Sequence, residues 1–197
     1  MSFKVKDHFY KKAKKEKFLA RSIYKLEEID KKHKLIKKDD RVLDLGYYPG
    51  SWIQYISKAV GPKGLVYGMD IQPINEKLKL PNITLLELDF REFDVDHFDF
   101  TSELFDVVTS DMAPKTTGMK DVDQARSMEL VENIFARLPK LLLPNGNLVV
   151  KVFESGESQR FFQKNRILFK ETSFLRPKST RSTSKEYFFI GKAYQPS

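Results

Sequence analysis

The sequence of 197 residues contains no cysteine and no long hydrophobic run. Without cysteine, the chain cannot form disulfides, thiolate metal sites or cysteine nucleophiles. Its longest apolar runs, such as Leu141 to Leu143, are far too short to span a membrane. The first ten residues also lack the apolar stretch of a secretory signal. We therefore expect a cytoplasmic protein with no membrane partner and no metal site.

Two familiar nucleotide-binding patterns are missing as well. The chain has neither the GxGxxG turn of dinucleotide enzymes nor the GxxxxGK[ST] turn of P-loop proteins. A nicotinamide oxidoreductase is therefore disfavoured, whereas other nucleoside ligands remain open.

The net charge of +8 is unevenly distributed along the chain. Residues 1–41 hold 15 basic and 7 acidic side chains, residues 42–150 hold 10 and 16, and residues 151–197 hold 10 and 4. A single lysine run is more often a solvated face than a binding site. Two basic ends that meet in space would form one positive surface suited to RNA. We expect one domain over residues 1–197, with a basic N-terminal arm at 1–17.

Near-continuous apolar runs between helical segments predict an α/β fold. Strands separated by helices indicate a mostly parallel sheet, with helices on both faces and one antiparallel strand near the end. The expected strands are 41–45, 65–69, 83–88, 105–110, 148–153, 170–175 and 187–193; the expected helices are 18–32, 51–59, 122–143 and 158–167.

Aspartates and glycines follow the predicted strands, where ligands of open α/β sheets bind. Gly46 and Gly50 lie in the first strand–helix turn, and Asp70, Asp89 and Asp111 end or follow three later strands. Each aspartate alone is better explained as a helix cap or turn residue. Together they indicate a nucleoside-bearing cofactor, with Asp70 at the ribose and Asp89 at the adenine amino group. An anionic pocket suits the sulfonium of S-adenosylmethionine better than a pyrophosphate.

Lys151 lies inside an otherwise apolar strand. A buried lysine needs a partner or a function, and apolar flanks on both sides argue against a lysine that reaches solvent from an edge strand. We therefore treat Lys151 as a candidate catalytic residue.

Five segments carry a resemblance to the FtsJ/RrmJ family of ribosomal RNA 2′-O-methyltransferases. The resemblance runs from about Phe9 to Tyr194. The segments are RSIYKL at 21–26, DLGYYPGSW at 44–52, SDMAP at 110–114, VVKVF at 149–153 and RSTSKE at 181–186.

The resemblance implies a Rossmann-like class I methyltransferase domain that uses S-adenosylmethionine. Its expected substrate is a ribose 2′-oxygen, that of a uridine, in large-subunit (23S-type) ribosomal RNA within the assembled subunit, and we expect a monomer. The family's catalytic tetrad maps onto Lys25, Asp111, Lys151 and Glu186. Its cofactor residues map onto Gly46, Pro49, Gly50, Trp52, Asp70, Asp89 and Asp111.

The tetrad suits this chemistry. A ribose hydroxyl is a poor nucleophile, and methyl transfer is an in-line displacement in which positioning supplies much of the rate. A neighbouring cation or burial can prepare a lysine to accept a proton, and a lysine can also stabilise a developing alkoxide. We expect Lys25 to act on Lys151 by repulsion while Asp111 and Glu186 orient it, and the base and orienting roles both stay open.

Two departures from the family pattern leave alternatives. Tyr47 and Tyr48 replace small residues, commonly alanines, and Ser51 replaces glycine. A tyrosine ring either packs beside the methionine part of the cofactor, or one ring enters the core and the other points to solvent. The bulk also favours a non-catalytic RNA-binding relative as one alternative function, and methylation of tRNA or an mRNA cap is another.

Overall fold

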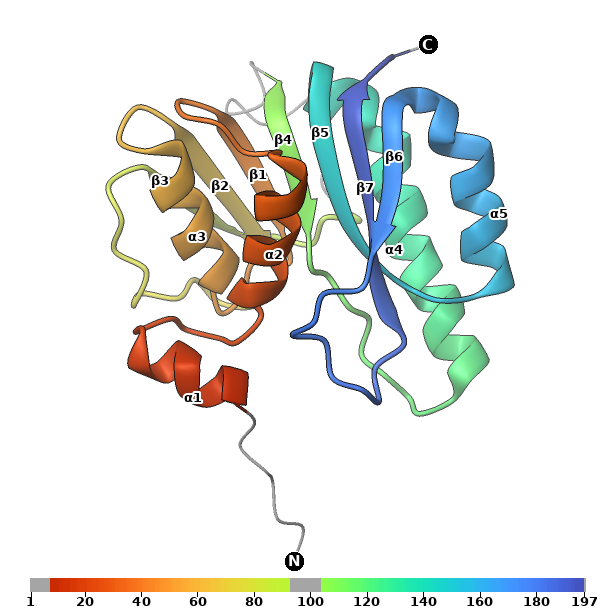
Figure 1. The fold of residues 1–197 in the computed structure, drawn as a ribbon, viewed down its shortest axis with the longest axis horizontal. Helices are drawn as coiled ribbons and strands as arrows, with labels where there is room; N and C mark the ends of the chain where they lie inside the picture. The colour runs from red at the N-terminus through yellow and green to blue at the C-terminus, as the bar shows by residue number, and fades with distance from the viewer. Residues whose placement is uncertain (1–7, 93–103, 197) are drawn as a thin grey trace, which may run out of the picture.

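The computed structural model describes residues 8–92 and 104–196. Within these ranges one seven-stranded sheet has the order β3-β2-β1-β4-β5-β7-β6 (Figure 1). Strands β1 to β5 pair in parallel, whereas β7 is antiparallel to both β5 and β6. The predicted mostly parallel sheet with one antiparallel strand near its end is therefore confirmed. The strands are β1 Arg41–Leu45, β2 Leu65–Asp70, β3 Ile83–Glu87, β4 Phe105–Ser110, β5 Leu142–Phe153, β6 Phe169–Leu175 and β7 Glu186–Tyr194.

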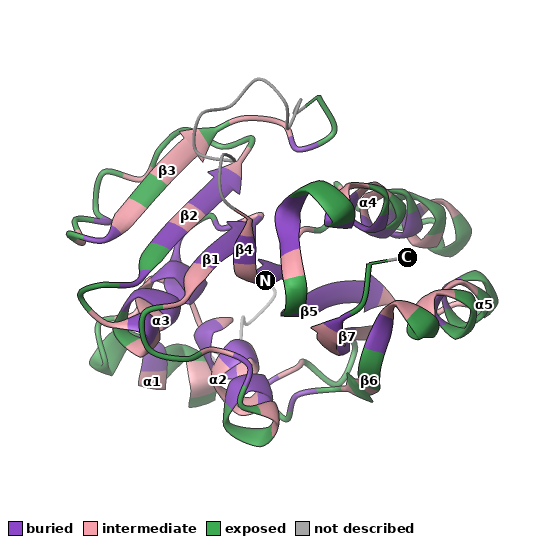
Figure 2. Cartoon of the chain, turned by 90° about the horizontal axis from the view of Figure 1, so that it is seen from above, coloured by how far each residue is buried: buried purple, intermediate pink, exposed green. Residues whose placement is uncertain are grey.

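Helices cover both faces of the sheet, and alternation along the strands divides the core between them (Figure 2). Val150 and Val152 of β5 pack in the core under the α4 and α5 helices, while Val149 packs in the core under α2 and α3. The helices are α1 His8–Lys15, α2 Ile23–His33, α3 Ser51–Val60, α4 Lys120–Leu141 and α5 Gly156–Asn165, with a short 3₁₀ helix at Arg166–Leu168.

Helix α2 begins later than its apolar stripe predicts. Residues 18–22 form a turn because tertiary hydrogen bonds to α3 replace helical ones. The Leu19 amide donates to Oε1 of Gln54 at 2.9 Å, and Nε1 of Trp52 donates to the Ser22 carbonyl at 2.8 Å. Residues 8–15 of the predicted arm form the short helix α1, whose Ala13 packs against Ile23. Residues 1–7 of that arm lie outside the described residues.

The boundary between α4 and β5 also differs from expectation. The helix ends at Leu141, and β5 begins at once with Leu142. Pro144, Asn145 and Gly146 were predicted to separate helix and strand, but they lie inside β5. They form an irregular stretch at which the β4–β5 register shifts, and Asn145 there has a φ of 66°.

Candidate active site

The carboxyl ends of the parallel strands lie at the lower edge of the sheet in Figure 1. The antiparallel β7 begins at this same edge, where β5 ends. Glu186 is accordingly in register with Phe153, and Phe188 with Lys151. The direction of β7 thus brings a residue from near the C-terminus to the carboxyl ends of the parallel strands.

Lys151 is buried, with only 9% of its surface exposed. It shares the α2–α3 face of β5 with Val149. Its Nζ donates to Oδ1 of Asp111 at 2.8 Å and also to the Asp111 carbonyl. The Asp111 amide donates to the Leu45 carbonyl at 3.2 Å, which fixes this carboxylate relative to β1. The buried lysine predicted from the apolar strand therefore has a partner.

Lys25 on α2 forms an ion pair with Glu186 of β7. Both side chains are largely buried. The Lys25 Nζ lies 5.8 Å from the centre of the Phe188 ring, beside the residue that pairs in register with Lys151. The structure thus brings the four predicted tetrad residues together as two lysine–carboxylate pairs.

Helix α2 and the loop before β7 are tied together, which holds the Lys25–Glu186 pair. Arg21 donates to the Ser179 carbonyl, and the Lys178 amide donates to Oε2 of Glu28 at 2.9 Å. The position of Lys25 therefore depends on contacts between elements far apart in sequence.

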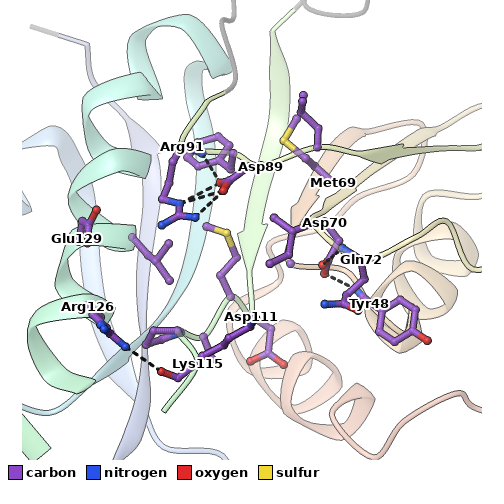
Figure 3. A pocket seen from close by; sticks show the side chains of 18 residues that line it. Tyr48, Met69, Asp70, Gln72, Asp89, Arg91, Asp111, Lys115, Arg126 and Glu129 are labelled. Atoms are coloured by element: carbon purple, nitrogen blue, oxygen red, sulfur yellow. Dashed lines mark hydrogen bonds and ion pairs between the residues drawn. The ribbon is translucent and has the colours of Figure 1, made fainter. Parts of the chain in front are cut away.

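A pocket of about 760 Å³ opens beside the tetrad at Asp111 (Figure 3). Its size is typical of a small-molecule site. Of the predicted cofactor residues, Gly46, Asp70, Asp89 and Asp111 line it, whereas Pro49, Gly50 and the Trp52 side chain do not. Apolar walls complete it, from Met69, Ile71, Leu88, Phe90, Met112, Ala113, Pro114 and Leu130.

Asp70 and Asp89 are held by backbone amides two positions further on. The Gln72 amide donates to Asp70 Oδ1 at 2.9 Å, and the Tyr48 amide donates to Asp70 Oδ2 at 2.9 Å. The Arg91 amide donates to Asp89 Oδ1 at 2.9 Å. Each oxygen of Asp70 accepts one such bond and keeps a further lone pair for a ligand hydroxyl.

The sequence did not indicate the role of Arg91. Its guanidinium forms a bidentate contact with Asp89, with Nη2 2.6 Å from Oδ2, and this lowers the pKa of Asp89. Arg137 of α4 in turn donates to the Arg91 carbonyl at 3.0 Å and lies over the Phe90 ring. The spacing of Asp89 and Arg91 was the available sequence signal.

The backbone of the turn after β1 explains why two of its positions are glycine. Gly46 has a φ of 74°, and a Cβ added there would lie 2.6 Å from Cγ of Met112. Gly50 has a φ of 112°, and its added Cβ would lie 2.1 Å from Cδ1 of Leu78. Both positions therefore require glycine for conformation and for space. The Trp52 ring lies in the core against Phe188, at 5.8 Å between ring centres.

The two tyrosines of this turn point in different directions. Tyr47 is 3% exposed and lies in the core under α3. Tyr48 is 48% exposed and lies at the pocket rim beside Asp70 and Gln72 (Figure 3). Ser51 is buried and shares a 2.9 Å hydrogen bond with Ser22, so this departure from the family pattern joins α3 to the turn before α2.

Asp44 is a second residue whose environment the sequence did not reveal. It is fully buried in β1, and burial raises its pKa well above the ordinary value. Thr109 donates to Oδ1 at 2.7 Å, while Oδ2 has no hydrogen-bond partner among the described residues. The charges of Asp111 and Asp70, which follow or end the strands on either side of β1, also raise this pKa.

The donor set fits S-adenosylmethionine. Apolar walls suit the adenine ring, and Asp70 suits ribose hydroxyls. Four carboxylates line the pocket against three basic side chains, and this excess of negative charge suits a cation. Among residues 8–92 and 104–196, no cluster of three histidine, aspartate or glutamate side chains could hold a metal ion. No helix in these ranges is both long enough and apolar enough to cross a membrane.

Comparison with known proteins agrees with this geometry. The model of a family described as FtsJ-like methyltransferase matches residues 18–194. Two relatives named ribosomal RNA large subunit methyltransferase E are each 43% identical. The Bdellovibrio bacteriovorus protein matches over 97% of this chain and 98% of its own length, and the Oleidesulfovibrio alaskensis protein over 98% and 93%.

Solved structures share the fold. A Plasmodium falciparum chain described as a ribosomal RNA methyltransferase superposes with a TM-score of 0.78 at 24% identity, covering 90% of this chain and 98% of that one. Fibrillarin from Aeropyrum pernix, solved with natively bound S-adenosylmethionine, gives a TM-score of 0.60 at 17% identity, covering 80% and 68%. At these identities the likeness concerns the fold alone.

Proposed function

The chain belongs to the FtsJ-like methyltransferase family, and we propose that it methylates a ribose 2′-oxygen in large-subunit ribosomal RNA with S-adenosylmethionine. The observation that carries the proposal is the buried Lys151, held by Asp111 at the edge of the pocket and beside the Lys25–Glu186 pair. The finer proposal is that a uridine of the assembled subunit is modified, by a monomer acting in the cytoplasm.

We assign cofactor binding to the pocket and catalysis to the tetrad. The bound cofactor supplies a methyl group on a positively charged sulfur. Asp70 would hold the ribose hydroxyls, and Asp89 the adenine amino group. Gly46 and Asp111 lie where the remainder of the molecule would be bound. Pro49, Gly50 and the Trp52 side chain would act on the cofactor indirectly, by shaping the turn and packing α3 against the sheet.

The tetrad residues would position the nucleophile and handle its proton. Lys151 Nζ is oriented by Asp111, so it can face a ribose hydroxyl in one direction only. A neutral Nζ would accept the hydroxyl proton as the oxygen–methyl bond forms, and a protonated Nζ would stabilise the developing alkoxide. Each lysine of the tetrad has its own counter-charge, because Glu186 pairs with Lys25 and Asp111 pairs with Lys151.

The basic N-terminal helix supports an RNA substrate. Helix α1 exposes Lys11, Lys14 and Lys15, and it packs near the tetrad through Ala13, Ile23 and Tyr24. Replacing the three lysines by glutamine should keep this packing and weaken RNA binding. The negative slope of log K against log salt should become flatter, by about 0.9 for each duplex phosphate that the variant no longer neutralises. An unchanged slope and affinity would show that α1 is only a solvated face.

The proposed function is tested by transfer of labelled methyl groups to three RNA classes. Large ribosomal subunits from cells lacking the protein should accept about one methyl group each. The phosphodiester linkage next to the methylated ribose should then resist alkaline hydrolysis. Transfer RNA and capped messenger RNA test the two enzymatic alternatives and should remain unlabelled. Labelling of either one in preference to the subunit would overturn the assignment. Absence of transfer, with no cofactor binding, would favour the non-catalytic relative.

A further inference from the structure

A second hollow, of about 600 Å³, lies on the α5 face of the sheet, away from the tetrad. It sits between α5 and the strands β6 and β7. Several of its residues belong to the same edge of the sheet as the tetrad, because Glu154 follows β5 and Leu175 ends β6. Tyr187 lines the hollow, and its neighbour Glu186 belongs to the tetrad. Successive residues of a strand face opposite sides, so β7 separates the two sites.

The floor of this hollow is aromatic and well fixed. Phe162 and Phe189 stack with ring centres 4.5 Å apart. The Tyr187 hydroxyl lies 3.0 Å from Oγ of Ser158, at the capped start of α5. Such packing holds the rings in one arrangement before any ligand binds.

Phe174 adds a ring that the fold leaves open. It lies 5.4 Å from Tyr187 and 5.6 Å from Phe162, measured between ring centres, yet 52% of its surface is exposed. An exposed aromatic ring beside an aromatic floor is suited to a planar partner that stacks on it.

The rim of the hollow is polar and basic. Gln159 and Gln163 supply amide groups, and Arg166 and Arg176 supply guanidinium groups, against the single carboxylate of Glu154. The Nη2 of Arg176 donates only to backbone carbonyls of the loop before β7, so no carboxylate of the described chain neutralises it. The charge of the rim complements a phosphate, and its amides complement the edge of a nucleobase.

We propose that this hollow binds an unpaired nucleotide of the RNA substrate that flanks the modified one, with its base on Phe174 and its phosphate at Arg166. The inference rests on the proposed function, since it assumes an RNA that already reaches the tetrad. An RNA strand that passes around the start of β7 would meet Glu186 on one side and the aromatic floor on the other. The hollow would then help to select which ribose enters the tetrad.

The first test uses Phe174→Leu, which keeps an apolar side chain and removes the ring. The apparent KM for large ribosomal subunits should rise about 5- to 150-fold, as expected when one base no longer stacks on an aromatic ring, with cofactor affinity unchanged. Ile167→Ala is the matched control, because Ile167 is 75% exposed in the short helix just before β6 and does not line the hollow. A KM equal to that of the control would overturn the inference.

Two surface variants keep the inference testable if Phe174→Leu fails to fold. Arg166→Gln should raise the KM for subunits severalfold, whereas Arg160→Gln, on the helix just before it but outside the hollow, should not. Equal values for the two variants would overturn the inference. Wild-type activity in the same assay separates this outcome from failure of the proposed function itself.

Crosslinking identifies the occupant. A photoreactive benzoylphenylalanine in place of Gln163 should crosslink to ribosomal RNA when the protein is mixed with large subunits and irradiated. A crosslink to a ribosomal protein instead, or to nothing while wild-type protein methylates the same subunits, would contradict an RNA-binding hollow.

Discussion

The tetrad and the cofactor pocket meet at Asp111, but they are held together in different ways. The tetrad pairs lie between separate elements: Lys25 on α2 contacts Glu186 on β7, and Lys151 on β5 contacts Asp111 after β4. Asp70 and Asp89 are instead held mainly by local turns, in which a backbone amide donates to the carboxylate two residues before it, and Asp70 also accepts from the Tyr48 amide.

This difference has a functional consequence. The tetrad depends on the register of β5 and β7, whereas the pocket depends mainly on short turns after β2 and β3. Changes in the tetrad should therefore affect the chemical step with little effect on cofactor binding, and changes in the pocket should do the reverse.

The largest expected effect is that of Lys151→Ala. It should lower single-turnover methyl transfer by about 10²- to 10⁴-fold, the usual contribution of a general base. Cofactor affinity, measured by calorimetry, should stay unchanged. Lys192→Ala is the control, since that lysine also belongs to a strand, β7, and pairs with Glu171 at 3.3 Å. Activity of Lys151→Ala within a few-fold of the control would remove the catalytic assignment.

The next largest effect concerns Asp70→Ala and Asp89→Ala. Each should lose hydrogen bonds to the cofactor, at about 1–3 kcal/mol apiece, and so bind S-adenosylmethionine about 5- to 150-fold more weakly. RNA affinity should be unaffected. The exposed Asp121 of α4, changed to alanine, serves as the control. If both pocket variants bind the cofactor like this control, the strand-end pocket is not the cofactor site.

Tyr48→Ala should give a smaller effect, because only one of the two tyrosines reaches the pocket. A ring that contacts the sulfonium would favour the charged cofactor over the neutral product, S-adenosylhomocysteine, by about 0.5–2 kcal/mol. The variant should therefore lose affinity for the cofactor alone. Tighter binding of both ligands would mean that the ring only narrows the pocket, and no change would place it outside the site.

Asp44→Asn should have the smallest effect, a pH-dependent change in the stability of the fold. Burial raises the pKa of Asp44, so the folded state keeps a proton that the unfolded state releases above about pH 3.9. The native protein therefore loses stability as pH rises from that value through the folded pKa. The melting temperature of Asp44→Asn relative to wild type should increase between pH 4 and pH 7.

Asp39→Asn, which changes an exposed carboxylate, is the control for this measurement. A constant difference in melting temperature across the pH range would contradict a buried, proton-retaining Asp44.

The sequence alone predicted the sheet and its antiparallel strand, because these depend on apolar strand runs. The tetrad assignment came from the family resemblance, and its catalytic role stays a prediction. The sequence could not predict the positions of side chains that are determined by tertiary contacts. The motif indicated Trp52 as a cofactor residue, but the indole belongs to the core beside Phe188 and bonds the turn before α2. The same hydrogen bond to the turn also helps to explain why α2 begins only at Ile23.

The two tyrosines show the limit most clearly. The two residues are adjacent in the sequence, and tertiary packing places Tyr47 in the core while Tyr48 lies at the rim. Asp44 begins the DLGYYPGSW segment, but its burial, and an Oδ2 that is unpartnered among the described residues, depend on neighbouring strands.

The central claim is that the tetrad methylates a ribose of large-subunit ribosomal RNA. Its most direct test is quantitative mapping of 2′-O-methyl groups in that RNA from cells lacking the protein, complemented with wild type or with Lys151→Ala. One methylated position should be lost without the protein, restored by wild type and absent with Lys151→Ala. An unchanged methylation map without the protein, or full restoration by Lys151→Ala, would contradict the claim.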